Sequence, residues 1–249
     1  MPLVETTIFI ARHGETLWNL EKRMQGQKDS PLTEKGLKQA ETLANALRVR
    51  MSGPAGEGTI TSVWSSCLGR AKRTAEICAE VLDAAVTPAK GLNEIALGQW
   101  EGLTFQEAEK MSPEQFYNFW HRPSKYIPTA GGETFQELQD RMINVLKSIC
   151  STHAGQNVLV ISHWIAIKTV LVRVQGLGLD GGGVQVAAIH HDNDGGIAQG
   201  RLQAQLLRGE DHEQRFARAL EMPDKPFAGI SRLYTFHNGF CCLILRVAW

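Results

Sequence analysis

The stretch Thr7–Ala11 (TIFIA), followed at once by Arg12-His13-Gly14, decides the fold of this chain. A short, continuous apolar run that ends at a glycine is typical of a buried parallel strand. The stretch Val158–Ser162 (VLVIS) has the same character, and it ends at His163. The sequence therefore predicts two buried parallel strands, each with a histidine at its carboxyl end.

Helical and strand patterns alternate along the rest of the chain. Apolar residues at helical spacing, together with start signals such as the capping box Thr134–Glu137, predict several helices. The helices are expected to begin at Thr33, Arg70, Ser112, Thr134 and Ile165, and further strands to cover Ile60–Ser65, Gly229–Phe236 and Phe240–Val247, the last two as a hairpin. This alternation predicts an α/β protein with three α/β/α layers and a mainly parallel central sheet.

The length of 249 residues fits a single domain, 1–249, with an insertion at about 181–214. The insertion opens with three consecutive glycines and is rich in Gly, Gln, His and Asp. Such a composition is unusual for core structure, so we expect an excursion from the domain. Its place would suit a lid over a site or a contact between two subunits of a homodimer.

Charge and hydropathy exclude several classes of protein. Lys and Arg number 26, as do Asp and Glu, so the formal net charge is zero. A nucleic-acid-binding protein usually has a basic excess, and we expect no such partner here. The longest apolar stretch, Val158–Val174, contains charged residues and changes period, so it predicts a strand and a helix, not a membrane span.

The cysteines and the N-terminus point to the cytoplasm. The five cysteines are scattered and form no CxxC motif, which disfavours a zinc site or a disulfide framework. The first residues lack the basic and apolar regions of a signal peptide. We expect a cytoplasmic protein whose cysteines are reduced.

Four residues are candidates for a shared site at the carboxyl edge of the predicted sheet. His13 and His163 each follow a strand, and ligands of open α/β sheets bind at this edge. Arg12 adjoins His13, and Arg70 opens the predicted helix after the strand Ile60–Ser65. Guanidinium groups match phosphate geometry, and helix N-termini favour anions. A lone histidine would more often be structural, but two histidines with two arginines indicate a phosphoryl-binding pocket.

Six motifs in this order resemble the histidine phosphatase superfamily, which includes the phosphoglycerate mutases. The resemblance covers about three-quarters of the chain, and it is strongest to the broad-specificity bacterial phosphatases and α-ribazole phosphatases. The motifs are ARHGETLWN (11–19), PLTEKG (31–36), SSCLGRAKRTA (65–75), LNEIALGQWEG (92–102), GGETFQELQDR (131–141) and VLVISH (158–163).

The resemblance implies a role for each matching residue. His13 would accept the phosphoryl group as a phosphohistidine, and Glu94 would act as proton donor and then proton acceptor. Arg12, Arg70 and His163 would bind the phosphoryl oxygens. Substrate contacts are expected from Asn19, from Gln25-Gly26 at the entrance and from Trp164. The implied reaction needs neither a metal nor another cofactor, and its product would be inorganic phosphate.

Elementary chemistry agrees with these implied roles. Imidazole attacks phosphorus only in its neutral form, and nearby guanidinium charges favour that form. Phosphoryl transfer depends mainly on positioning and on charge compensation, which fixed donors can supply. An alkoxide leaves poorly at neutral pH, so a protonated carboxyl beside the bridging oxygen assists its departure.

Trp164 departs from the family pattern, because a glycine or another small residue commonly follows the second histidine. Its indole could point away from the pocket or narrow it. Three functions remain open: a phosphatase acting on a small phosphate monoester, a cofactor-dependent phosphoglycerate mutase, and a phospho-ligand binding module that has lost catalysis. The segment that follows Glu94 resembles phosphatases more than mutases. The sequence does not identify the leaving group.

Overall fold

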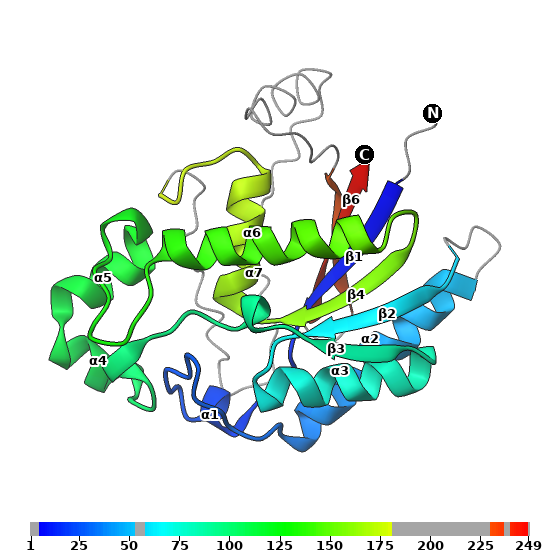
Figure 1. Cartoon of the computed structure of the whole chain (residues 1–249). Coiled ribbons are helices and arrows are strands. Elements are labelled where there is room, and N and C mark those ends of the chain that lie inside the picture. Colours follow the sequence, from blue (N-terminus) through cyan, green and yellow to red (C-terminus); the bar gives the residue numbers. More distant parts are fainter. Residues whose placement is uncertain (1–4, 53–57, 181–229, 237–239, 249) are drawn as a thin grey trace.

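One mixed β-sheet organises the chain (Figure 1). The computed structural model describes residues 5–52, 58–180, 230–236 and 240–248. The strands form one six-stranded sheet in the order β3-β2-β4-β1-β6-β5. Strands β1 to β4 run parallel, β6 is antiparallel to β1, and β5 is antiparallel to β6. They span β1 Glu5–Arg12, β2 Ile60–Ser65, β3 Ala85–Pro88, β4 Asn157–Ser162, β5 Ile230–Phe236 and β6 Phe240–Ala248.

Helices cover both faces of this sheet, so the predicted three-layer α/β/α fold is confirmed (Figure 1). Helices α2 and α3 lie on one face and α6 and α7 on the other, while α4 and α5 form a lobe beside the sheet. The helices are α1 Leu17–Leu20, α2 Glu34–Ser52, α3 Gly69–Leu82, α4 Phe105–Met111, α5 Pro113–His121, α6 Phe135–Thr152 and α7 Trp164–Val174. Short 3₁₀ turns are η1 Lys90–Leu92, η2 Gly98–Trp100 and η3 Pro123–Lys125.

The apolar run of β1 is buried on both of its faces. Ile8 and Ile10 belong to the core beneath α6 and α7, whereas Phe9 and Ala11 belong to the core beneath α2 and α3. Side chains alternate between the faces of a strand, so two covered faces require a continuous apolar sequence. The partners include Leu138, Met142 and Val170 on the first face and Leu43, Leu47 and Ala75 on the second.

Strand register brings three carboxyl ends to one edge of the sheet. Arg12 at the end of β1 pairs with Ser162 at the end of β4, and Ser65 of β2 pairs with Ile161. The residues that follow these strands therefore emerge side by side. Gly14 is needed at this edge because an added Cβ would lie 2.3 Å from the carbonyl oxygen of Gly36 in α2. Its small size therefore allows the close approach of α2.

The structure adds elements that the sequence analysis missed. Strand β3 and helix α1 have only four residues each, too few to show a period. Helix α4 begins with a capping box at Thr104, a signal that was overlooked. Ser112 precedes α5 as expected, but its side chain makes no capping hydrogen bond. The predicted antiparallel pairing of the last two strands is confirmed.

The predictions about the insertion and the extent of the domain concern residues that lie partly or wholly outside the described ranges. The insertion at about 181–214 is outside them, so the proposed single domain, lid and dimer contact stay predictions. Within the described ranges, no helix combines the length and the apolar character that a membrane crossing requires. The stretch Val158–Val174 accordingly forms β4 and α7.

Candidate active site

His13 lies directly after β1, and the protein fixes its ring in one tautomer. Its backbone N–H donates to the carbonyl of Ser162, 3.0 Å away, and its side chain is buried. The ring Nδ1 lies 2.7 Å from the carbonyl oxygen of Gly14. A carbonyl only accepts, so Nδ1 carries the proton and the neutral ring keeps its lone pair on Nε2.

Arg70 directs its guanidinium at that lone pair. Its Nε donates to Nε2 of His13 at 3.2 Å. The other guanidinium nitrogens bind the loop before α2: Nη1 contacts the carbonyl of Lys28 at 2.7 Å and Asp29 Oδ1 at 3.1 Å, and Nη2 contacts the carbonyl of Gly26 at 2.8 Å. This anchoring holds a buried cation against His13, as the sequence predicted.

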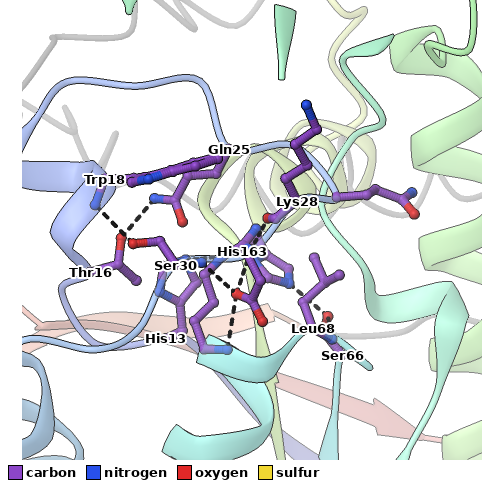
Figure 2. A network of polar contacts seen from close by, with 12 residues as sticks. His13, Thr16, Trp18, Gln25, Lys28, Ser30, Ser66, Leu68 and His163 are labelled. Carbon is purple, nitrogen blue, oxygen red and sulfur yellow. Dashed lines mark hydrogen bonds and ion pairs between the residues drawn. The ribbon is translucent and has the colours of Figure 1, made fainter. Parts of the chain in front are cut away.

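His163 lies beside His13, and their ring centroids are 5.1 Å apart. Its Nε2 is 2.7 Å from Ser66 Oγ (Figure 2). Ser66 Oγ in turn donates to Asn93 Oδ1 at 3.0 Å. The backbone N–H of Cys67 also donates to this Asn93 oxygen, which identifies it as the amide carbonyl. Ser66 has one proton, and Asn93 takes it, so His163 must donate from Nε2.

Since Nε2 donates to Ser66, Nδ1 is the remaining nitrogen of the His163 ring, which is fully buried. Nδ1 is buried and has no hydrogen-bond partner among the described residues. Buried polar atoms are usually paired, so an unpaired one beside His13 indicates a position that a ligand completes. A protonated His163 could donate from Nδ1 to a phosphoryl oxygen.

Glu94 occupies a loop between the turns η1 and η2, and its carboxylate meets the N-terminus of α7. Oε1 accepts from the backbone N–H of Ile95 at 3.0 Å and of Ala166 at 3.1 Å, whereas Oε2 accepts from Ile165 at 3.2 Å. Two donors occupy Oε1 and one occupies Oε2. A carboxylate oxygen has two acceptor sites, so Oε2 is the atom that can take and release a proton.

The surroundings shift the acid–base properties of all three groups. Burial lowers the pKa of His13 well below its ordinary 6.5, and the charges of Arg12 and Arg70 lower it further. Burial and the charge of Arg70 lower the pKa of His163 in the same way. Burial raises the pKa of Glu94 from its ordinary 4.5, against the backbone hydrogen bonds that favour the carboxylate. The site thus favours neutral imidazoles next to a carboxyl group that holds its proton more strongly than usual.

The structure brings together the five core candidates, Arg12, His13, Arg70, Glu94 and His163. Arg12 is half-buried at the end of β1, where its charge acts on both histidines. The Arg70 charge acts on Glu94 as well as on both histidines. Their arrangement follows the expected sheet edge, and the catalytic roles that the resemblance implies remain proposals.

The four candidates for substrate contact lie around this core in different ways. Gln25 is buried and donates from Nε2 to Thr16 Oγ1 at 2.9 Å (Figure 2). Asn19 accepts through Oδ1 in the capping box of α1, so its carbonyl serves Thr16. Gly26 has a φ of +51°, a left-handed conformation that suits glycine, and its carbonyl binds Arg70.

Trp164 begins α7, and its indole lies against Lys168 one turn further along. The Lys168 ammonium is 4.9 Å from the ring centroid, a cation–π distance. The pairing places the indole along the flank of the helix, and the N-terminal N–H groups of Ile165 and Ala166 still reach Glu94. Among the described residues, the structure shows no hydrogen bond or ring contact between the Trp164 indole and the five core side chains, although Trp164 directly follows His163.

Several residues of the site escaped the sequence analysis. Ser66, Thr74 and Arg141 stand inside quoted motifs, but no role was predicted for them. Thr74 Oγ1 accepts the backbone N–H of Gly14 at 3.1 Å. Asp29 carries no sequence signal, because its partner Arg70 is distant in the chain. Among the described residues, no group of three His, Cys, Asp or Glu side chains is arranged to hold a metal ion.

Comparisons with known proteins agree with this geometry. The family model of the histidine phosphatase superfamily (branch 1) matches residues 8–195. A metal-independent phosphoserine phosphatase of Arabidopsis thaliana is 35% identical over 175 residues, which cover 68% of this chain and 68% of that protein. A "Probable phosphoglycerate mutase GpmB" of Salmonella paratyphi B is 38% identical over 176 residues, covering 68% of this chain and 75% of its own.

Solved structures show the same fold. Bacillus stearothermophilus YhfR is 37% identical, with a TM-score of 0.65 over 73% of this chain and 84% of that chain. An alpha-ribazole-5'-P phosphatase candidate from Escherichia coli is 26% identical, with a TM-score of 0.60 over 70% and 81%. The chain therefore belongs to the histidine phosphatase superfamily.

Proposed function

We propose that this protein is a phosphomonoester hydrolase that acts through a phosphohistidine at Nε2 of His13. The observation that carries the proposal is the fixed tautomer of His13: Nδ1 donates to Gly14, and Nε2 holds a lone pair 3.2 Å from the Arg70 guanidinium. The nucleophilic nitrogen of His13 and the anion-binding guanidinium of Arg70 are thus in direct contact. A phosphoryl group that binds Arg70 would arrive beside the nitrogen that attacks it.

In the first proposed step, Nε2 of His13 attacks phosphorus and the bond between phosphorus and the leaving oxygen breaks. Glu94 gives the proton of its carboxyl group to that oxygen, so the alcohol leaves neutral. In the second step, the Glu94 carboxylate takes a proton from water while the water oxygen attacks phosphorus. The bond from phosphorus to Nε2 then breaks, and inorganic phosphate and the starting enzyme result.

Positive charge in the pocket would offset the charge on the phosphoryl oxygens. Arg12 and Arg70 supply permanent cations, and the unpaired Nδ1 of His163 would donate once that ring is protonated. A bound dianion would favour this protonation, because an anion next to imidazole raises its pKa. Hydrogen bonds hold Arg70 and His163 in place before substrate arrives, and such fixed groups stabilise a phosphoryl-transfer transition state.

The proposed substrates are small phosphate monoesters. The similar proteins carry names that refer to phosphoserine, phosphoglycerate and α-ribazole phosphate, all of them small phosphorylated metabolites. The balanced charge of the chain supports a metabolite rather than a nucleic acid as partner. A cytoplasmic location, a homodimer and independence from metals belong to the same proposal.

A direct test is hydrolysis of p-nitrophenyl phosphate in excess EDTA by the wild type and His13→Ala. We expect metal-independent release of phosphate by the wild type and loss on the order of 10⁴-fold in the variant, as when a covalent nucleophile is removed. Equal rates in the two proteins would refute the proposed nucleophile. Activity that EDTA abolishes would refute the proposed metal independence.

A phosphoglycerate mutase is the second candidate, because one similar protein carries that name. The two functions differ in what receives the phosphoryl group. Incubation with 3-phosphoglycerate, followed by separate measurement of free phosphate and of 2-phosphoglycerate, distinguishes them. We expect phosphate to exceed the isomer at all times; accumulation of the isomer without phosphate would identify a mutase.

A further inference from the structure

Arg141 of α6 makes an unusually complete set of hydrogen bonds next to the site, although no step proposed above uses it. Its Nη1 donates to the carbonyls of Gly91 at 3.0 Å and Asn93 at 2.7 Å. Its Nη2 donates to the carbonyl of Glu94 at 2.8 Å and to Glu133 Oε2 at 2.8 Å, and its Nε donates to Glu133 Oε1 at 2.6 Å. A guanidinium group has five N–H donors, and all five are used.

The carbonyls that Arg141 binds belong to the segment that carries the Glu94 carboxyl. Glu133 extends the contact, because its Oε2 also accepts the backbone N–H of Ala96 at 3.2 Å. Arg141 and Glu133, which we call the clamp, thereby fix four backbone groups between residues 91 and 96. Both side chains are mostly buried, with exposed fractions of 23% and 15%, so water competes weakly with these bonds.

Other support for the Glu94 backbone is weaker: Gln27 Nε2 donates to its carbonyl at 3.4 Å, a long hydrogen bond. Glu94 lies in an irregular loop between η1 and η2, where no strand ladder or helix holds the chain. Its carboxylate is held from the opposite side by the N–H groups of α7. The residue is thus fixed between two helices, with its backbone bound to α6 and its side chain bound to α7. Loss of either support would let Oε2 move away from the leaving oxygen.

The clamp requires an arginine. A lysine ammonium has the same charge but only three donors on a single nitrogen, so it cannot reach three carbonyls and both oxygens of a carboxylate together. Arg141→Lys therefore keeps the charge near the site and removes the geometry. This separation of charge from geometry makes the variant informative.

We propose that the Arg141–Glu133 clamp positions the Glu94 carboxyl for proton transfer to the leaving group. The inference rests on the function proposed above, in which Glu94 is the general acid. A positioning role has a signature that general destabilisation lacks. A strongly basic leaving oxygen needs the proton and a weakly basic one does not, so in the first step loss of positioning should slow only the first kind of substrate.

The experiment compares phenyl phosphate with p-nitrophenyl phosphate, two esters of similar shape. Phenolate is a strong base, with a conjugate-acid pKa of about 10 as in tyrosine, whereas nitrophenolate is a much weaker one. Glu94 also acts in the second step, which is common to both esters, so the measured quantity is kcat/KM, which reports the first step alone. For Arg141→Lys we expect kcat/KM for phenyl phosphate to fall about 30-fold and kcat/KM for p-nitrophenyl phosphate to fall about threefold or less. Glu94→Gln should show the same selectivity to a greater degree.

Two further variants complete the test. Arg23→Lys is the matched control, because Arg23 also binds a carbonyl, that of Gly102, and a carboxylate, that of Glu21, but contacts neither Glu94 nor its segment. It should slow both esters by the same small factor. Glu133→Gln removes the other half of the clamp and serves if Arg141→Lys does not fold, as judged by urea unfolding.

Equal loss for both esters in Arg141→Lys or in Glu133→Gln would overturn the positioning role and leave a structural one. No loss for either ester would overturn it as well. Failure of the proposed function would look different: His13→Ala would keep its activity, or Glu94→Gln would show no selectivity between the esters.

Discussion

His13 and Glu94 would carry the two halves of the proposed reaction, yet the protein holds them in opposite ways. His13 follows a central strand, and its two ring nitrogens are held by the Arg70 side chain and by the Gly14 carbonyl. Glu94 lies in a loop, where an arginine fixes its backbone and the hydrogen bonds to its carboxylate from the described residues come from backbone N–H groups. At His13, the Arg70 guanidinium contacts the reactive Nε2. At Glu94, the Arg141 guanidinium contacts the backbone carbonyl instead of the carboxylate.

This difference suits the opposite protonation states that the two groups need. Burial, together with the charges of Arg12 and Arg70, disfavours a second proton on His13, whereas burial without a guanidinium bonded to its carboxylate lets Glu94 keep a proton. The comparison shows two uses of a buried arginine. Arg70 contacts the nucleophilic nitrogen of His13 directly, whereas Arg141 would position the Glu94 carboxyl by binding its backbone. Each prediction below alters one side of this comparison.

The largest effect is expected from Arg70→Met, which removes the cation from the His13 side. The value of kcat/KM for p-nitrophenyl phosphate should fall on the order of 10³-fold, because a guanidinium that stabilises phosphoryl charge is lost. Arg73→Met on the same helix is the control, since Arg73 is exposed and, within the described part of the chain, its ion-pair partner is the exposed Glu76. A loss of about tenfold or less in Arg70→Met, relative to Arg73→Met, would mean that Arg70 is mainly structural.

The next effect concerns the Glu94 side and its dependence on pH. In the wild type, kcat/KM for phenyl phosphate should rise with pH on a limb below 6.5, where His13 loses its proton, and fall on a limb above 4.5, where Glu94 loses its own. Glu94→Gln should slow this ester about 10²-fold and lose the falling limb.

The ionisation of the substrate itself is common to both profiles, so the comparison of wild type with Glu94→Gln isolates the enzyme group. A variant that is slower but keeps the falling limb would show that another group supplies the proton.

A smaller effect is expected when the hydrogen bond between His163 and Ser66 is removed. Ser66→Ala removes the acceptor of the Nε2 proton, which leaves a buried donor unpaired and costs about 1–3 kcal/mol of unfolding free energy. We expect kcat/KM to fall about tenfold, since about 1.4 kcal/mol of lost positioning corresponds to that factor.

Ser65→Ala is the matched control for this variant. Ser65 is an adjacent buried serine whose hydroxyl has no hydrogen-bond partner among the described residues. Urea unfolding and steady-state kinetics should separate the two variants. Equal behaviour of both would show that Ser66 does not set the tautomer of His163.

The smallest effect is expected from Trp164→Leu, at the boundary between the two sides. The indole packs against Lys168, and such a cation–π contact contributes about 0.5–2 kcal/mol. Burial lowers the pKa of Lys168 to about 8. We expect the free energy of unfolding to decrease by an amount within that range, and KM for p-nitrophenyl phosphate to change about threefold or less. A much larger change in KM would indicate that the indole contacts substrate, as the sequence analysis allowed.

The sequence predicts the His13 side better than the Glu94 side, and the reason is physical. His13 and His163 follow strands with a clear apolar pattern, and parallel strands bring their carboxyl ends together. Glu94 lies in a loop with no period, so only the resemblance to the family indicated it. Its position depends on Arg141, which is 47 residues away in the chain.

The parts of the site that the sequence did not predict are contacts between side chains far apart in the chain. Asp29 reaches Arg70 across 41 residues, and Ser66 joins His163 across 97. Neither pair leaves a local pattern. The fold itself was predictable because β1 and β4 are buried on both faces, which produces a continuous run of apolar residues in the sequence.

The most direct test of the account is to trap the covalent intermediate. The protein would be mixed briefly with ³²P-labelled substrate prepared from a small phosphate monoester, denatured in alkali and digested. We predict a label that is stable in base, labile in acid and attached to the peptide that contains His13, and no such label in His13→Ala. A label that survives acid, or that persists in His13→Ala, would contradict the account.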